Sequence, residues 1–275
     1  MSNLRPIPVF WWSEKHLQGK SKENYGDLVG KYLVEKISGK PVVWNHPKHF
    51  SLNNLWQPTF VTAGSILAHV NKRCVVWGSG IISTDHPVKK AKAFLAVRGP
   101  RSHHRLKSLG YQVPEVFGDP ALLLPRFFRS NPSKRHTVGI IPHYVDYEMV
   151  KQWYAQDEEV HVIDLMTNDI EEVTTQIASC RYTLSSSLHG IIVSHAYGIP
   201  SVRVLFSDKI FGDGVKYDDY LESVGLRNYE PTYIDEAIPA DALVDLVKAN
   251  PMQLPDSTAI HNIQEGLMNV CPFKG

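Results

Sequence analysis

Three serines followed by a leucine and a histidine form the segment of this chain best suited to chemistry; they are Ser185, Ser186, Ser187, Leu188 and His189. A short apolar run precedes them, and an apolar stretch with helical spacing follows. We therefore expect a strand, a turn and a helix, with His189 in the first turn of the helix. Because the first N–H groups of a helix lack intrahelical partners and its dipole favours negative charge, this turn predicts a pocket for phosphate or carboxylate. An imidazole beside that pocket can exchange a proton near neutral pH.

Two arginines, Arg98 and Arg101, follow another apolar run and are separated by a glycine and a proline that force a turn. Planar guanidinium groups bind carboxylate or phosphate through paired hydrogen bonds, so we expect one of the two to bind an anion. The alternative is a surface arginine that pairs with a nearby acid. Lys209 and Lys216 are further candidate anion ligands. We interpret residues 213–221 as a charged and aromatic loop, and a solvated loop without a ligand is the alternative.

Four further residues lie where strands are expected to end: Gly78, Ser79, Asp119 and His143. Gly78 and Ser79 predict a tight turn that a ligand or backbone can approach closely, and the missing third glycine argues against a dinucleotide-binding loop. Asp119 either caps a helix or faces the cleft. His143 ends an apolar run, where it would point toward a ligand unless its role is structural.

Composition narrows the class of protein. The chain has 275 residues with 29 Lys plus Arg and 28 Asp plus Glu, and a net charge of +1 argues against nucleic acid as a partner. Cys74, Cys180 and Cys271 form no CxxC pair, which suits a reducing compartment. The sequence has no recognisable metal-binding motif, so we expect a site without metal or cofactor. No stretch approaches the about 20 apolar residues of a membrane helix, and we expect a soluble, cytoplasmic protein.

The elements that must position these residues follow a repeating α/β pattern. Short β-branched or aromatic runs predict strands in the first half at residues 8–12, 41–44, 60–63, 74–77, 94–97 and 115–117. The second half predicts strands at residues 137–142, 160–165, 182–185 and 201–206. Helices are expected at residues 27–37, 147–156, 169–179, 188–197 and 241–275. Asn24 is the polar residue placed to cap the first helix, which Asp27 opens.

Alternation of strands and crossover helices predicts parallel, doubly wound sheets. The polar, basic stretch 126–135 is the expected linker between two Rossmann-like domains, residues 1–130 and 131–275, that face each other across a cleft. We expect the last helical segment to pack back, either on the N-terminal domain or on its own half. Since ligands of such sheets bind outside the carboxyl ends of the strands, the polar residues named above should meet in that cleft.

Five short segments, taken in this order, resemble the polysaccharide pyruvyl transferase family: Asn24-Tyr25-Gly26-Asp27, Gly78-Ser79-Gly80, Val97-Arg98-Gly99-Pro100, Gly118-Asp119-Pro120-Ala121 and Ser185-Ser186-Ser187-Leu188-His189-Gly190. Lys216-Tyr217-Asp218-Asp219-Tyr220 before Ser223-Val224-Gly225 matches as well, and the likeness covers roughly residues 6–225. The resemblance implies a glycosyltransferase-B-like pairing of the two domains. It also implies an enzyme that moves the enolpyruvyl group of phosphoenolpyruvate onto a sugar, galactose above all, of a bacterial surface polysaccharide or exopolysaccharide. The product is a cyclic pyruvate ketal, and phosphate is released.

The resemblance also implies roles for single residues. Arg98 and His189 carry over as donor-binding and catalytic positions. Substrate contacts are expected from Asn24, Asp27, Gly78, Ser79, Arg101, Asp119, His143, Ser186, Ser187, Leu188, Lys209 and Lys216. Many relatives have an arginine where this chain has Ser187, so one donor-binding cation must come from elsewhere, with Arg101, Lys209 and Lys216 as candidates.

Two other functions stay open: a nucleotide-sugar-dependent glycosyltransferase of the same fold, and a non-catalytic protein that binds a sugar or an anion. The expected acceptor is a galactose-containing glycan or a lipid-linked oligosaccharide, and the latter would bring the enzyme close to a membrane surface. Four tryptophans, Trp11, Trp12, Trp44 and Trp56, either stack on a sugar face or pack in the core, and core packing is expected for most of them.

Overall fold

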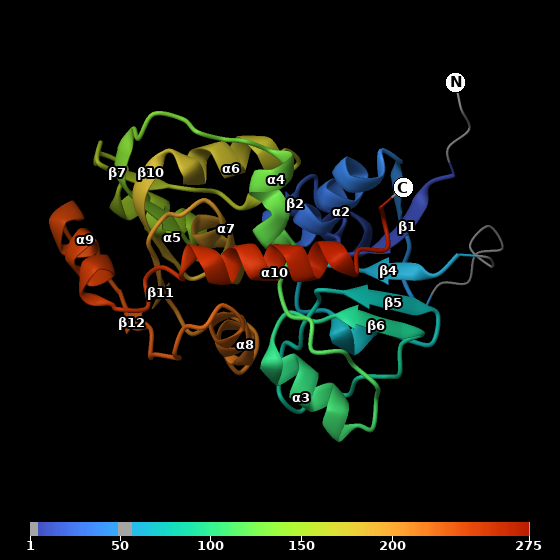
Figure 1. The fold of residues 1–275 in the computed structure, drawn as a ribbon. Helices are drawn as coiled ribbons and strands as arrows, with labels where there is room; N and C mark the ends of the chain where they lie inside the picture. Colours follow the sequence, from blue (N-terminus) through green and yellow to red (C-terminus); the bar gives the residue numbers. More distant parts are fainter. Residues whose placement is uncertain (1–4, 49–56, 275) are drawn as a thin grey trace.

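Two parallel sheets dominate the computed structural model, which describes residues 5–48 and 57–274 (Figure 1). Within these residues, each half contributes one five-stranded sheet. The first has the strand order β3 (Val42–Trp44), β1 (Ile7–Phe10), β4 (Thr59–Val61), β5 (Cys74–Trp77) and β6 (Ala93–Ala96). The second has the order β12 (Thr232–Tyr233), β11 (Ser201–Leu205), β10 (Cys180–Ser185), β7 (His136–Ile141) and β8 (Val160–Val162). Neighbouring strands run parallel in both, which confirms the predicted α/β class with parallel sheets.

The helices connect and cover these strands. In chain order the α-helices are α1 (Glu14–Gln18), α2 (Tyr25–Ser38), α3 (Pro100–Ser108), α4 (Leu124–Phe127), α5 (Tyr147–Trp153), α6 (Ile170–Ala178), α7 (Leu188–Ala196), α8 (Val215–Ser223), α9 (Ala240–Ala249) and α10 (Ser257–Asn269). The described residues also form two 3-10 turns, η2 (Leu67–His69) and η3 (Pro120–Leu123). None of the helices in residues 5–48 and 57–274 is long and apolar enough to cross a membrane.

Both faces of each sheet are covered, which explains why the strands read as unbroken apolar runs. Successive side chains of a strand point to opposite faces. In the first sheet, Val9 therefore packs with α2, whereas its neighbour Phe10 packs with η2 and α3. In the second sheet, Ile141 packs with α6 and α7, whereas Ile140 packs with α5 and α9.

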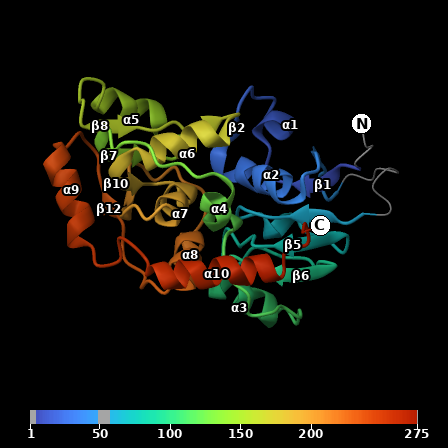
Figure 2. The same cartoon turned by 45° about the horizontal axis from the view of Figure 1, so that its top comes forward.

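One apolar cluster joins the two halves, since it extends from Val9 of β1 to Ile141 of β7. Helices α2, α4 and α7 lie between the sheets and contact one another (Figure 2). A short antiparallel pair, β2 (Glu23–Asn24) with β9 (Met166–Thr167), links the halves at the start of α2. The position at which α2 begins is therefore set by residues of the other half.

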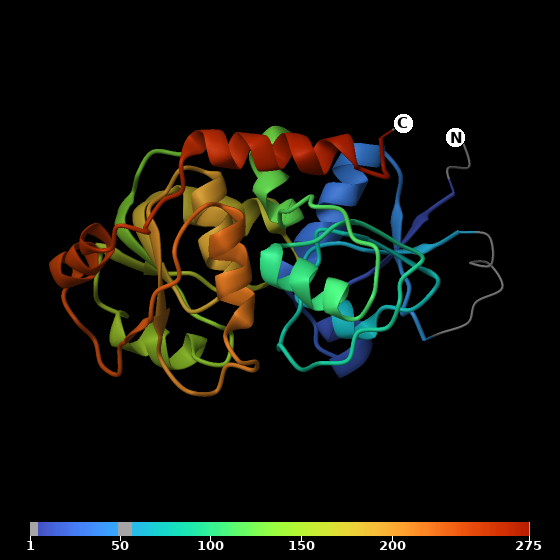
Figure 3. The same cartoon turned by 60° about the horizontal axis from the view of Figure 1, so that its bottom comes forward.

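The last helix, α10, lies along one side of both halves (Figure 3). The indole Nε1 of Trp77 in β5 donates a hydrogen bond to the carbonyl of Leu267 at 3.0 Å. The ring of Phe273 contacts the same indole edge-on, with ring centroids 5.4 Å apart. The C-terminal segment is thus in direct contact with the first sheet.

Among the predicted strands and helices, one strand and one helix differ from the structure. Residues 115–117 form no strand, because only Phe117 pairs, with Val97, through an isolated bridge before the chain turns at Gly118. The single helical stretch predicted at 241–275 is divided into α9 and α10, because two prolines between them cannot continue a helix. Of the predicted linker 126–135, Arg126 and Phe127 are the last residues of α4, and residues 128–135 contain neither helix nor strand.

The interpretation of residues 213–221 as a loop is wrong, because α8 begins at Val215. Tyr217, Tyr220 and Leu221 are buried on one side of this helix. Their i, i+3, i+4 spacing is typical of an amphipathic helix and was present in the sequence. Lys216 is consequently held on a packed helix rather than on a solvated loop.

Candidate active site

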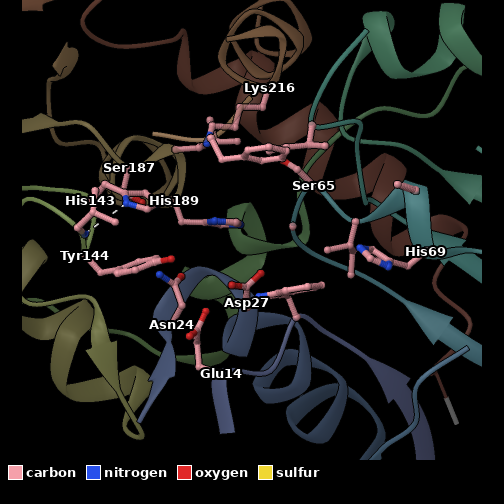
Figure 4. Close-up of a pocket in the computed structure, with 18 of the residues that line it drawn as sticks. Glu14, Asn24, Asp27, Ser65, His69, His143, Tyr144, Ser187, His189 and Lys216 are labelled. Atoms are coloured by element: carbon pink, nitrogen blue, oxygen red, sulfur yellow. Dashed lines mark hydrogen bonds between the residues drawn. The ribbon is translucent and has the colours of Figure 1, made fainter. Parts of the chain in front are cut away.

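A cavity of about 320 Å³ lies where loops of the two halves meet (Figure 4). Its walls are segments that follow β1, β4 and β5 in the first half and β7, β10 and β11 in the second. It therefore occupies the position outside the carboxyl ends of parallel strands at which α/β proteins bind ligands. The predicted site residues that line it are Asn24, Asp27, His143, Ser187, Leu188, His189, Lys209 and Lys216.

Serine hydroxyls hold the turn before α7. Ser185 Oγ donates to the carbonyl of Ile141 at 2.8 Å and accepts from the N–H of Ser187 at 3.0 Å. Ser186 Oγ accepts from the N–H of His143 at 2.8 Å, which joins this turn to the end of β7. Ser187 is the N-cap of α7, but its side chain makes no capping hydrogen bond. The first turn of α7 can therefore offer backbone N–H groups to an anion.

His189 lies in that first turn, as predicted, and a buried carboxylate faces its ring. Its Nε2 is 3.5 Å from Oδ2 of Asp119, which is fully buried. The other oxygen of Asp119 accepts from the N–H of Ala121 at 2.9 Å, so this carboxylate both caps η3 and faces the imidazole. Nε2 of His189 and Oδ2 of Asp119 are both buried and have no hydrogen-bond partner among the described residues, so this carboxylate is placed to orient an imidazole that carries its proton on Nε2.

Gly26 holds the imidazole from the other side. A Cβ at this position would come within 2.1 Å of His189 Nδ1. We expect Gly26→Ala to keep the fold but to push the ring away and lower turnover about 10²-fold, because a small displacement of a reacting group has that effect. Gly266→Ala in α10 is the matched control, since its Cβ would meet only Val116 at 3.7 Å. Steady-state kinetics and thermal melting check this, and equal turnover of the two variants would contradict it.

Of the titratable groups that line the cavity with His189, three have pKa values far from their ordinary ones. Burial raises the pKa of Asp27 to about 7, against the opposing effect of His189 and Lys216. Burial lowers the pKa of Lys216 to about 8, and the positive charges of Arg98 and Arg203 act in the same direction. Burial and the charge of Lys216 lower the pKa of His143 to about 4, so this imidazole is neutral. Near neutral pH the cavity therefore contains the ammonium of Lys216 beside the carboxyl of Asp27, which can give or take a proton.

The structure places Arg98 behind the cavity wall rather than in the cavity. Its side chain is fully buried, and all of its groups bind protein atoms. Nε donates to Oδ2 of Asp219 at 3.0 Å, one terminal nitrogen donates to the carbonyl of Ile81 at 2.7 Å, and the other donates to Oγ of Ser65 at 2.6 Å. Ser65 lines the cavity, so Arg98 influences the cavity through this hydroxyl and through the effect of its charge on Lys216.

Arg101 is likewise absent from the cavity lining. It pairs with Glu222 at 2.8 Å and with Asp218 at 3.4 Å, next to a separate surface hollow. The sequence left two interpretations of Arg101 open, an anion ligand or a surface arginine that pairs with a nearby acid. The structure agrees with the second. Both acids lie on α8. Asp218 falls within residues 213–221, which were interpreted as a loop from the sequence.

The turn at Gly78 and Ser79 supports the cavity without lining it. Gly78 has φ 93°, and a Cβ there would lie 2.3 Å from Pro120, so only glycine fits. Ser79 Oγ donates to the carbonyl of Gly64 at 2.8 Å and so holds the loop that carries Ser65. Ser186 also stays outside the cavity, where it fixes the backbone of His143 as described above.

Several lining residues were missed by the sequence reasoning: Glu14, Ser65, His69, His86, Tyr144 and Phe211. Glu14 and Ser65 follow strands β1 and β4, and polar residues just after predicted strands were the available signal. Of the four tryptophans, Trp12 lines the cavity, Trp11 is buried in the core, and Trp44 donates to the carbonyl of Trp11 at 3.1 Å. Trp56 lies outside the described residues. Within residues 5–48 and 57–274, no cluster of His, Cys, Asp or Glu has the geometry of a metal site.

Fold and cavity together define an α/β protein with a polar site between two parallel sheets, at the strand ends where such enzymes bind substrates. The family model of polysaccharide pyruvyl transferases matches residues 47–207. The chain is also similar to an uncharacterized protein of Acanthamoeba polyphaga mimivirus, with 35% identity over 210 residues that cover 74% of this chain and 72% of that protein. The chain therefore belongs to the polysaccharide pyruvyl transferase family, a family of transferases, and the predicted resemblance is confirmed.

Proposed function

We propose that this chain is a phosphoenolpyruvate-dependent pyruvyl transferase that builds a cyclic pyruvate ketal on a galactose-containing glycan. Membership of the family supports pyruvyl transfer. One observation supports an anionic donor: Lys216 lines the cavity, and none of the ion pairs among the described residues includes it. A partly buried cation with no carboxylate at ion-pair distance is unfavourable until a ligand neutralises it.

The donor has two anionic groups, and the cavity has two complementary features. The first turn of α7 offers N–H groups, and the ammonium of Lys216 offers a charge. Of the three cations expected to replace the arginine of many relatives, Arg101 is tied to acids and Lys209 is exposed at the rim. Lys216 is the enclosed one, and we assign the missing role to it.

The reaction needs one proton on carbon and two bonds to the sugar. Protonation of the methylene carbon of phosphoenolpyruvate leaves positive charge at the neighbouring carbon, which a sugar hydroxyl attacks. A second hydroxyl displaces phosphate and closes the ketal ring, so the two hydroxyl protons replace the one added to carbon and the one taken by phosphate. His189, oriented by Asp119, is the proton-transfer group, and Asp27 is the second acid or base within the cavity. Charges that hold the departing phosphate contribute to the rate as well.

The arrangement of the two halves also supports a proposal about the fold. One parallel sheet in each half, with the cavity between the strand ends, supports a glycosyltransferase-B-like pairing of domains 1–130 and 131–275. Substrates of such a pair bind between the domains, which agrees with the origin of the lining residues in both halves.

The direct test is incubation with phosphoenolpyruvate and a panel of galactosides. We expect phosphate release that depends on the galactoside and a product with the mass of the pyruvate ketal. Calorimetric titration with phosphoenolpyruvate and with a uridine-diphosphate sugar separates the donor classes, because the true donor binds without an acceptor. Binding of the nucleotide sugar, with none of phosphoenolpyruvate, would favour the glycosyltransferase alternative.

Replacement of the lysine ammonium tests the donor site. We expect Lys216→Met to weaken phosphoenolpyruvate binding about 10- to 100-fold, the effect of losing a charged hydrogen bond. In the unaltered protein, affinity should fall as the pH rises from 7 to 9, because Lys216 loses its proton and the carboxyl of Asp27 loses its own. In Lys216→Met only the contribution of Asp27 remains, so the fall should be smaller. Lys209→Met at the rim is the control and should bind nearly as the unaltered protein does. Calorimetry at pH 7 and pH 9 measures both effects, and a fall in Lys216→Met as large as that of the unaltered protein would contradict the assignment.

A further inference from the structure

The cavity has two chemically different ends. Ser187, His189 and Lys216 lie at the end formed by α7 and α8, which is the donor end of the proposed function. His69 lies on the far side, with Asp27 between it and His189 (Figure 4). Four aromatic residues of the lining form two contacting pairs, Trp12 with His69 and Phe211 with His86, and we call these four residues the aromatic end.

The side chains of the aromatic end contact one another in pairs and form one wall of the cavity. Trp12 and His69 are in contact, with ring centroids 5.3 Å apart and planes tilted by 44°. His86 and Phe211 form a second pair, with centroids 6.2 Å apart. Burial lowers the pKa of His69, so its ring is uncharged near neutral pH. The wall therefore offers flat, apolar faces without a positive charge from His69.

Phe211 is 70% exposed, yet its backbone is fixed. Asp213 Oδ2 accepts hydrogen bonds from the N–H of Thr84 at 2.8 Å and from its hydroxyl at 2.9 Å. A Cβ on Gly212 would lie 2.8 Å from the carbonyl of Ile82, so the two loops are in close contact. Phe211 therefore offers a largely exposed aromatic ring, held at the mouth of the cavity, to a ligand that enters it.

We infer that the aromatic end binds the acceptor, a hexopyranose ring that stacks its C–H face on Trp12 and is covered by Phe211. This inference rests on the proposed function, because it takes the opposite end of the cavity as the donor site. A sugar ring has one apolar face and a rim of hydroxyls, which matches an aromatic wall beside a carboxyl. Asp27 lies between the two ends and is placed to accept the hydrogen bond of an attacking hydroxyl.

Charge favours an uncharged sugar over a nucleotide diphosphate at this end. The carboxylate of Glu14 lines the same cavity and pairs with Lys20 at 2.6 Å. Asp27 is a second carboxyl in the cavity, and its ionised form would repel a diphosphate. Of the two lysines that line the cavity, Lys216 lies at the end formed by α7 and α8, and Lys209 is exposed at the rim.

Binding of methyl β-galactopyranoside tests the inference by saturation-transfer NMR, which needs no turnover. We expect Trp12→Ala and Phe211→Ala to lose most of the transferred signal and to raise the acceptor KM about tenfold. Phosphoenolpyruvate affinity should change less than about twofold, because the donor end is untouched. Tyr233→Ala is the matched control, since Tyr233 is 50% exposed and lies in β12, outside the cavity lining.

The outcomes separate this inference from the proposed function. A galactoside signal that is unchanged in both variants overturns the aromatic end as acceptor site, even if phosphoenolpyruvate still binds. Loss of a uridine-diphosphate signal in the same variants, without loss of the galactoside signal, overturns it too. If the unaltered protein binds the galactoside through these residues but binds no phosphoenolpyruvate, the sugar site stands and the proposed transfer fails. If Trp12→Ala does not fold, Phe211→Ala still tests the inference. Trp12→Phe keeps an aromatic ring at this position and should restore the signal.

Discussion

His189→Ala is expected to lower kcat/KM for pyruvyl transfer about 10²- to 10⁴-fold, the range that a single proton-transfer group contributes. The imidazole lies in the first turn of α7, with Asp119 at 3.5 Å from Nε2 and Gly26 against Nδ1. No other histidine of the described lining has a carboxylate at ion-pair distance. Phosphate release at saturating donor and acceptor measures the loss, and circular dichroism verifies the fold.

Two further variants separate catalysis from general damage. Asp119→Asn keeps a polar partner beside the imidazole but removes the charge, so we expect a smaller loss of activity and a shifted pH profile. His104→Ala should behave as the unaltered protein, because His104 is an exposed residue of α3. Phosphate release by His189→Ala at the unaltered rate would exclude the proposed role of this histidine.

The parts of the site that could be predicted are those encoded by local sequence. Ser187 and His189 follow an apolar run and begin an apolar helix, and both the strand and the helix start are reproduced. Parallel strands place their carboxyl ends at one edge of each sheet, so the position of Ser187 and His189 at a ligand-binding edge follows from topology. For Ser187 and His189, the local sequence pattern and the three-dimensional structure agree.

Long-range contacts account for what could not be predicted. The sequence shows a guanidinium at Arg98 beside a strand end, but not that Asp219, 121 residues later, pairs with it in the interior. Nor does it show that Gly26 lies against His189, because that contact depends on how the two halves pack. The error at α8 had a local cause, since charged and aromatic residues of a buried helix were interpreted as a loop.

The buried ion pair between Arg98 and Asp219 carries the largest expected effect on stability. Asp219 accepts hydrogen bonds from Arg98 Nε at 3.0 Å and from the N–H and hydroxyl of Ser102 at 2.9 and 2.6 Å. Both charged side chains are fully buried. Asp219→Ala would leave the guanidinium without its counter-charge, so we expect the free energy of unfolding to fall by about 3–5 kcal/mol. Denaturant titration measures this value.

The neighbouring residue on α8 provides the comparison. Asp218 pairs with Arg101 at 3.4 Å near the surface, so Asp218→Ala should cost about 1 kcal/mol or less. Similar losses in the two variants would contradict the interior role of Asp219. Because α8 also carries Lys216, Asp219→Ala should weaken phosphoenolpyruvate binding under conditions in which the protein remains folded. Replacing both partners, as Arg98→Met with Asp219→Leu, should recover much of the stability, since no unpaired charge is then buried, but should not recover donor affinity if the ion pair is what positions Lys216.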